Sequence, residues 1–218
     1  MGKLTGKLEF AAAWSFREAL KNGGAETKLS MVLMGLGNIV HKQVAKGLIY
    51  MAIEAAYVVF MIMTGFHCIS MLGSLGTVGQ QVVWDEVNQV YLYTKGDQSV
   101  LILLYGVAVL FLTVLMAAAW YGAVKSAYKA ECLDKAGKHV NNFAEDLKSL
   151  LHENLYRLFM TPPLTFIFSF TVLPLIFMIC MAFTNYSKID NHLVLFDWVG
   201  LDNFRALFDS GSILGSTF

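Results

Sequence analysis

The chain has 218 residues, of which 56% are hydrophobic and only 15% are charged. An ordinary soluble domain carries about 25% charged residues, so this composition excludes that class. The sixteen basic and sixteen acidic side chains give a formal net charge of zero, and nothing in their distribution suggests nucleic-acid binding. The composition therefore predicts an integral membrane protein.

Three apolar stretches are long enough to cross a bilayer, whose hydrocarbon core of about 30 Å needs roughly 20 helical residues. They are residues 47–72 and 99–124, of 26 residues each, and residues 163–183, of 21 residues. A buried soluble helix is an alternative for any one of them, but its length makes this a poor description of all three. The sequence predicts an all-α integral membrane protein with three transmembrane helices and amphipathic interfacial helices.

Lysine and arginine are unequally distributed among the segments outside these spans. Residues 1–46 carry seven and residues 125–162 carry six, whereas residues 73–98 carry one and residues 184–218 carry two. Cytoplasmic loops of membrane proteins are enriched in Lys and Arg. We therefore expect a plasma-membrane protein whose N-terminal region and 125–162 loop are cytoplasmic. The 73–98 loop and the 184–218 segment are expected outside the cell.

Amphipathic helices are predicted in the N-terminal region, residues 1–46, where Trp14, Phe16 and Leu20 form a short apolar patch and residues 29–46 form a longer helix. Apolar residues recur there at helical spacing: Leu29, Val32, Leu33, Leu36, Ile39, Val40 and Val44. Gly35 and Gly37 weaken the pattern, because glycine in a helix interior costs about 1 kcal/mol relative to alanine. We expect this helix to lie in the headgroup region of the membrane.

Another amphipathic helix is predicted in the 125–162 loop, again resting on the membrane. Its apolar stripe consists of Phe143, Leu147, Leu150, Leu151, Leu155 and Leu158. Asn142 and Glu145 have the spacing of an N-terminal capping box, and Pro162 is expected to end the helix. Docking of a protein partner is the alternative role for these amphipathic helices.

Glu54 is an acid inside the first predicted span, where an uncompensated charge costs about 2.5–3.5 kcal/mol at mid-bilayer. An intramembrane acid often belongs to a relay or a substrate pathway. Glu54 lies seven residues past Gly47, however, or about 11 Å along the helix. From there it can reach the membrane surface, Lys46 or a neighbouring helix, so we interpret it as structural.

Other residues near the membrane predict packing or anchoring. Pro174 lies in the middle of the third span, where it frees a carbonyl group and is expected to bend the helix. Ala118 and Gly122 form a small-x-x-x-small pair that would let another helix approach closely. Asp202 is expected to cap a short helix that follows it, and Trp198 to anchor that segment at the outer interface.

No motif for catalysis, metal binding or nucleotide binding is present. The five histidines, at positions 41, 67, 139, 152 and 192, lack the spacing of metal ligands. Neither G-x-x-x-x-G-K-[ST] nor G-x-S-x-G occurs. Cys68, Cys132 and Cys180 lack C-x-x-C spacing, so unpaired thiols are expected. The sequence predicts no enzyme activity, no cofactor, no metal site and no catalytic residues.

Five segments resemble the membrane subunits of bacterial sugar importers driven by ATP, the permeases of the ABC type. In chain order they are MGLGNIVHKQVAKGLIY, LILLYG, AEDLKSLL, LPLIFMICMAFTNYS and FDWVGLDNFRALF. The resemblance covers nearly all of the chain from about Leu29 onward. It is greatest to the larger maltose or maltooligosaccharide permease with an extended N-terminal region. AFTNYS and WVGLDNF are its more specific parts.

This resemblance implies a subunit that works with partners. A second permease subunit would complete the sugar pathway, a pair of cytoplasmic ATPase subunits would power it, and an extracellular sugar-binding protein would deliver the sugar. In the family, the sugar-contacting and ATPase-coupling residues follow the WVGLDNF segment. We therefore expect an N-terminal fragment that contains no substrate-binding residues. A small membrane scaffold or assembly protein that does not transport is the alternative.

Overall fold

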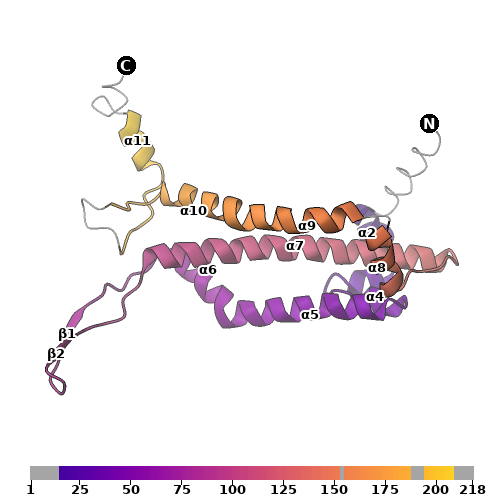
Figure 1. Cartoon of the computed structure of the whole chain (residues 1–218), viewed down its shortest axis with the longest axis horizontal. Helices are drawn as coiled ribbons and strands as arrows, with labels where there is room; N and C mark the ends of the chain where they lie inside the picture. Colours follow the sequence, from indigo (N-terminus) through magenta and orange to yellow (C-terminus); the bar gives the residue numbers. More distant parts are fainter. Residues whose placement is uncertain (1–14, 153–154, 188–193, 209–218) are drawn as a thin grey trace. The chain divides into compact units, whose positions relative to one another are not determined.

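The computed structural model describes residues 15–152, 155–187 and 194–208, and it is helical apart from one short hairpin (Figure 1). The other residues of the predicted N-terminal region and final segment, 1–14 and 209–218 among them, lie outside the described residues.

The described residues form two compact units. The basic unit, named for its lysines, contains the described residues of 1–62 and 112–163. The hairpin unit contains those of 63–111 and 164–218. Each unit combines segments that are distant in the sequence, and each is described by itself below.

Three helical segments are long and apolar enough to span a membrane, which confirms the predicted fold class. The first comprises α5 (Val44–Phe60), a π-helical turn (Met61–Gly65) and α6 (Phe66–Leu72). The second is α7 (Ser99–Lys135). The third comprises α9 (Leu155–Ile167), a second π-helical turn (Phe168–Val172) and α10 (Leu173–Met181). With 37 residues, α7 is about 55 Å long and extends well past the hydrocarbon core.

The prolines of the third helical segment do not end it. Pro162 and Pro163 lie inside α9, so the prediction that Pro162 ends a helix is wrong. A lipid-facing backbone has no water to satisfy its polar groups, which favours continuing the helix through a proline. Pro174 lies in the first turn of α10, directly after the second π-helical turn. The wider spacing of hydrogen bonds in a π-helical turn accommodates the hydrogen bond that proline cannot make, because proline has no backbone N–H.

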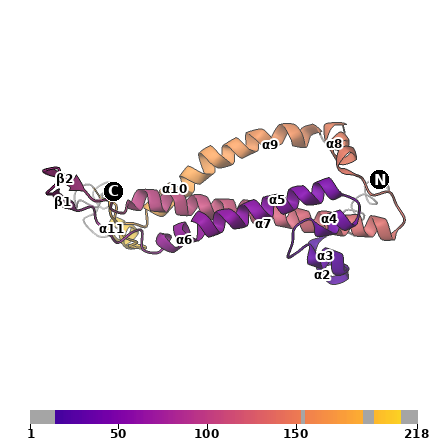
Figure 2. The same cartoon turned by 90° about the horizontal axis from the view of Figure 1, so that it is seen from below.

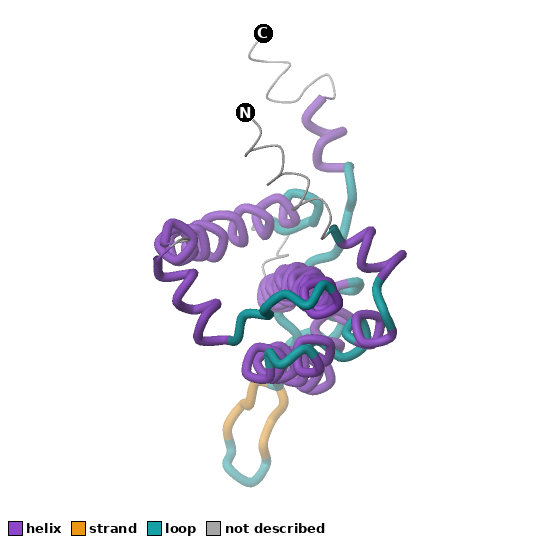
Figure 3. Tube along the Cα trace, turned by 90° about the vertical axis from the view of Figure 1, so that its right-hand side faces the viewer, coloured by secondary structure: helices purple, strands orange, loops and turns teal. Residues whose placement is uncertain are grey.

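The 73–98 loop contains a β-hairpin that the sequence analysis did not predict, drawn in orange in Figure 3. β1 (Val82–Asp85) pairs antiparallel with β2 (Val90–Tyr93). The Asp85 carboxylate accepts hydrogen bonds from the Asn88 side chain at 2.7 Å and from the backbone N–H of Val87 at 2.9 Å. These bonds hold the pKa of Asp85 below its ordinary value and close the turn between the strands.

Residues 29–46 do not form the continuous amphipathic helix predicted for them. The N-terminal region forms three short helices, α2 (Phe16–Asn22), α3 (Ala25–Leu29) and α4 (Leu36–Val40), of which only α4 lies wholly within residues 29–46. Gly35 interrupts the predicted helix because its φ angle of 87° lies in the left-handed region. Figure 2 shows the three helices gathered along one side of α7.

Close backbone approach explains why glycines occur in this region. A Cβ atom on Gly35 would lie 2.4 Å from the carbonyl oxygen of Gly47, and one on Gly47 would lie 2.5 Å from the carbonyl oxygen of Gly35. Gly37 faces α7, where a Cβ atom would lie 2.9 Å from the Cβ of Ala127. The glycines that weaken the helical pattern in the sequence thus allow α4 to pack against α5 and α7.

The helix α8 (Phe143–His152) begins with the predicted capping box. The backbone N–H of Asn142 donates to the Glu145 carboxylate, and the backbone N–H of Glu145 donates to the Asn142 side-chain oxygen, both at 2.9 Å. The bond from Asn142 and a second from the His139 ring hold the pKa of Glu145 below its ordinary value. The prediction of a capped helix at this position is confirmed.

Candidate functional site

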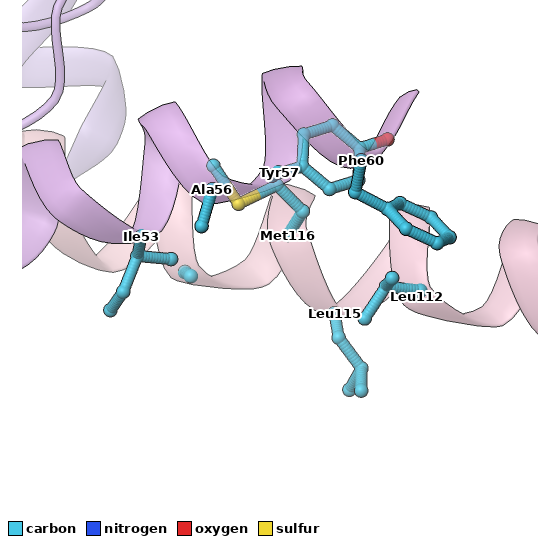
Figure 4. A pocket seen from close by; sticks show the side chains of 8 residues that line it. Ile53, Ala56, Tyr57, Phe60, Leu112, Leu115 and Met116 are labelled. Atoms are coloured by element: carbon cyan, nitrogen blue, oxygen red, sulfur yellow. The ribbon is translucent and has the colours of Figure 1, made fainter. Parts of the chain in front are cut away.

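An apolar groove lies between α5 and α7 in the basic unit (Figure 4). Its volume is about 440 Å³, and it is lined by Ile53, Ala56, Tyr57, Phe60, Leu112, Leu115, Met116 and Ala119. Beside it, the Tyr57 hydroxyl donates to the Thr113 hydroxyl oxygen at 3.0 Å. A sugar site needs several convergent polar groups, so the chemistry of this groove suits hydrocarbon rather than a sugar.

Glu131 of α7 is the principal polar anchor of the N-terminal helices. Its side chain is only 2% exposed. The carboxylate accepts two hydrogen bonds from the backbone N–H of Gly24, at 2.8 and 3.1 Å, one from the Thr27 hydroxyl, and one from the Lys135 ammonium at 2.5 Å. Gly24 precedes α3 and has no side chain to cap it. Glu131 therefore caps α3 from another helix, where its charge also favours the helix N-terminus.

His41 and Asn38 fasten α4 to the same end of α7. The two ring nitrogens of His41 lie 3.0 Å from the Glu26 carboxylate and 2.9 Å from the Asp134 carboxylate. The Asn38 amide nitrogen donates to the Ser126 hydroxyl at 3.0 Å. Both His41 and Asn38 are buried. Polar side chains therefore hold α4 in place where an apolar core would do so in a soluble domain.

Side chains of the first two spans also bind the backbone of the turn between α3 and α4. The Glu54 carboxylate accepts the backbone N–H of Met34 at 2.8 Å. The Trp120 indole N–H donates to the carbonyl oxygen of Met31 at 2.9 Å. These contacts support the structural interpretation of Glu54. Its partner is this turn and not Lys46, which pairs with Asp146 at 2.8 Å.

In the hairpin unit, the two segments that carry the more specific resemblance bind each other. We call residues 182–187 and 194–203 the clasp. The Asn203 side chain donates to the carbonyl oxygens of Ala182 and Thr184, at 2.9 and 2.7 Å. Asn185 and Asp197 exchange two hydrogen bonds, at 3.1 and 2.7 Å. The WVGLDNF segment therefore folds back onto the end of α10.

The clasp also contacts the other two spans. Phe196 is 1% exposed and belongs to a buried cluster with Leu75, Leu103 and Val107. Its backbone N–H donates to the hydroxyl of Ser99, the first residue of α7, at 3.1 Å. The Trp198 indole N–H donates to the carbonyl oxygen of Leu72, the last residue of α6, at 2.8 Å. Trp198, predicted as an interfacial anchor, therefore also joins the clasp to the first span.

Two of the predicted packing features differ from expectation. The helix α11 (Asp202–Phe208) begins at Asp202, so this residue lies in its first turn and does not cap it. The Asp202 carboxylate pairs with Arg205 at 3.2 Å. A Cβ atom on Gly122 would meet nothing within 4 Å, so no helix of the described chain approaches closely there.

No three His, Cys, Asp or Glu residues in the described ranges are placed to hold a metal ion. Cys68, Cys132 and Cys180 are free thiols. Sequence patterns do not single out Glu131 or His41, although each is a polar residue next to small or apolar ones. That placement is the signal that could have drawn attention to them.

The chain is similar to permeases of bacterial sugar transport systems. It is 26% identical to the maltodextrin transport system permease protein MdxF of Bacillus subtilis (strain 168), over 84% of this chain and 39% of the relative. It is 28% identical to the galactooligosaccharides transport system permease protein GanP of the same organism, over 87% and 42%. The maltodextrin transport system permease protein MalC of Streptococcus pneumoniae is 26% identical, over 86% and 40%.

The chain thus spans about two fifths of the length of the curated relatives it matches. No protein-family model and no solved structure matches it. The resemblance to sugar permeases that the residues indicate is confirmed by these homologues.

Proposed function

We propose that this chain, a homologue of maltodextrin and galactooligosaccharide permeases, forms part of the membrane-spanning permease of an ATP-driven sugar importer. The observation that carries the proposal is similarity to such permeases along 84–87% of the chain. Three helices able to span a membrane support it. The substrate would be a maltose-type or other oligosaccharide. A second permease subunit, cytoplasmic ATPase subunits and an extracellular sugar-binding protein would be its partners.

Within this permease we assign the chain a framing role. The first two spans pack around the transport pathway, and the third closes its outer wall. The clasp supports this role, because Phe196 and Trp198 join the third span to the ends of α6 and α7. The apolar chemistry of the groove also supports it. Sugar contact and coupling to the ATPase fall to the permease regions that correspond to the unmatched three fifths of the relatives.

The proposed orientation has residues 1–46 and 125–162 on the cytoplasmic side and residues 73–98 and 184–218 outside. It is supported by thirteen Lys and Arg in residues 1–46 and 125–162 against three in the other two segments. Val87, at the hairpin turn, is 90% exposed, and His139 is an exposed residue of the basic unit. In a cysteine-free background, Val87→Cys should react with an impermeant maleimide on intact cells and His139→Cys only after permeabilisation. The reverse pattern would contradict this orientation.

Association with the other importer subunits tests the proposal as a whole. The full chain is tagged in its native host, extracted in a mild detergent, and its partners are quantified by mass spectrometry. A second permease subunit and an ATPase subunit should be recovered together, and an unrelated multi-pass protein with the same tag provides the control. Recovery of other membrane proteins without any ATPase subunit would favour the scaffold alternative and contradict the proposal.

A further inference from the structure

We propose that residues 29–40, which run from the end of α3 through α4 and are called the α3–α4 segment below, form a re-entrant element that inserts into the lipid of one membrane leaflet. The exposed side of this segment contacts the acyl chains of the bilayer, and not water or a protein. The inference concerns the basic unit alone and does not depend on which sugar, if any, is transported.

The distribution of residues in this segment is the inverse of that in a soluble protein. Ser30 and Asn38 are fully buried. Val32 is 71% exposed and Leu29 is 52% exposed. Burying a side chain of this size away from water is favourable by about 1.5–3 kcal/mol. Of its large apolar residues Met34 is buried, whereas Leu33 and Val40 are exposed as well, so this surface is favoured by apolar surroundings.

Hydrogen bonds place the turn between α3 and α4 beside the first two spans, at a level between the ends of these spans. Met34 binds Glu54, which lies ten residues into α5, or about 15 Å along its axis. Met31 binds Trp120, which lies four residues before the end of the apolar stretch 99–124. Both partners belong to helices that are apolar enough to cross a membrane. The turn therefore lies beside the membrane-spanning part of these helices, not beyond their ends.

The sequence of the turn suits this location. Residues 29–40 contain no charged side chain, and Lys28 and Lys42 flank them. An apolar stretch of 10–14 residues is too short to span a bilayer and is typical of a re-entrant or interfacial segment. Non-helical backbone at this depth persists only where protein groups satisfy it. Glu54 accepts the Met34 N–H, and the Ser30 hydroxyl oxygen accepts the Gly37 N–H at 2.5 Å.

Lipid is favoured over a protein partner because the exposed apolar surface is continuous with that of a span. α4 packs against α5, and the first turns of α5 expose Val44 and Leu48. The lipid that covers α5 therefore meets the α3–α4 segment as well. Glu54 has a specific role in this arrangement. It is a positioning residue that supplies an acceptor to a backbone donor with no access to water.

Spin-label accessibility measures the surroundings of this segment directly. A nitroxide is attached at Val32→Cys in the full chain, with the native cysteines replaced by serine and the protein in lipid vesicles. Collision with oxygen, which partitions into lipid, is compared with collision with a water-soluble nickel chelate. Ile62→Cys, in the first span, is the lipid control, and Val87→Cys, in the hairpin turn, is the water control.

The Val32 label should collide preferentially with oxygen, as the Ile62 label does. Preferential collision with nickel, as for the Val87 label, would place the segment in water and overturn the proposal. Poor collision with both reagents would indicate that protein covers the segment, which would also overturn it.

Variants of Glu54 test its positioning role by the same readout. Glu54→Gln retains an acceptor oxygen and should leave the oxygen-to-nickel ratio at Val32 unchanged. Glu54→Leu removes the acceptor and should shift that ratio toward nickel, while the ratio at Ile62 stays the same. An unchanged ratio in Glu54→Leu would contradict the role assigned to this residue.

Discussion

The basic unit and the hairpin unit differ in the polar groups that join their distant segments, although each contains a buried apolar cluster. In the basic unit, the buried Glu131 carboxylate accepts hydrogen bonds from Gly24 and Thr27, and the ring of buried His41 lies between two carboxylates. In the hairpin unit, Phe196 lies in an apolar cluster and the clasp is closed mainly by neutral hydrogen bonds. A hydrogen bond to a charged group contributes about 1.5–3 kcal/mol, against about 0.5–1.5 kcal/mol for a neutral one. The basic unit should therefore be the more sensitive of the two to single side-chain truncations.

Truncating Glu131 should have the largest effect. Glu131→Ala leaves the Gly24 N–H and the Thr27 hydroxyl without their acceptor, and each buried donor left unsatisfied costs about 1–3 kcal/mol. Hydrogen exchange of the full chain in nanodiscs should show loss of protection in α2 to α4 and none in the clasp. Glu131→Gln keeps an acceptor and should lose less. Equal loss of protection in both units would contradict the expected difference in their sensitivity to truncation.

Adding one methyl group at Gly35 should have the next largest effect. Gly35→Ala combines a left-handed backbone, which costs about 1–2 kcal/mol for a residue with a Cβ atom, with an overlap against the Gly47 carbonyl oxygen. Thermal unfolding in detergent should move to lower temperature. Gly122→Ala is the matched control, because its Cβ atom has open space and alanine favours the helix. If both variants unfold at the wild-type temperature, the packing described for α4 is incorrect.

Truncation at the clasp should have a smaller effect that is confined to the hairpin unit. Asn203→Ala removes two neutral hydrogen bonds and should destabilise the clasp by about 1–2 kcal/mol. Proteolysis near residues 184–203 should become faster, while the basic unit keeps its protection. Arg205→Ala, in the same helix, removes an exposed ion pair and should have no measurable effect. Faster cleavage in the Arg205 variant but not in the Asn203 variant would contradict the role of the clasp.

Acid should have the smallest effect, in the loop before the hairpin. The Asp97 carboxylate accepts the backbone N–H groups of Val78 and Thr77, both at 2.9 Å, and these bonds lower its pKa from the ordinary value of 3.8. A group whose pKa is lower in the folded state than in the unfolded state stabilises the fold at pH values above its unfolded-state pKa. That stabilisation is lost as the pH falls through the folded-state pKa. Protection of these two amides should therefore decrease below about pH 4. Asp97→Asn should abolish that dependence, and a wild-type profile in this variant would exclude Asp97 as its source.

Features that depend on neighbouring residues could be predicted from the sequence. The three apolar stretches and the Asn142–Glu145 capping box are of this kind, because hydropathy and cap spacing act within one helix. The separation of residues 29–46 into α3, α4 and the start of α5 depends on the contact of Gly35 with Gly47, which no helical periodicity reveals. The hairpin consists of two four-residue strands, too short for alternation to distinguish them from a loop.

The contacts of the candidate site were less predictable than its elements. The position of Glu54 near the end of a span indicated a structural role, but its partner Met34 lies in a turn that the sequence analysis expected to be helical. The cap made by Glu131 and the contacts of the His41 ring with two carboxylates depend on the packing of the N-terminal region against α7. The AFTNYS and WVGLDNF segments were singled out by resemblance alone, and their mutual hydrogen bonds give a physical reason for their residues.

Sugar uptake tests the proposed function most directly. The gene for the chain is deleted in its host, and uptake of labelled maltodextrins, galactooligosaccharides and related oligosaccharides is measured with and without complementation by the same chain. Uptake of at least one oligosaccharide should be lost on deletion and restored on complementation, because the permease would lack the spans that frame it. Uptake that stays unchanged for every sugar tested would contradict a role for this chain in sugar import.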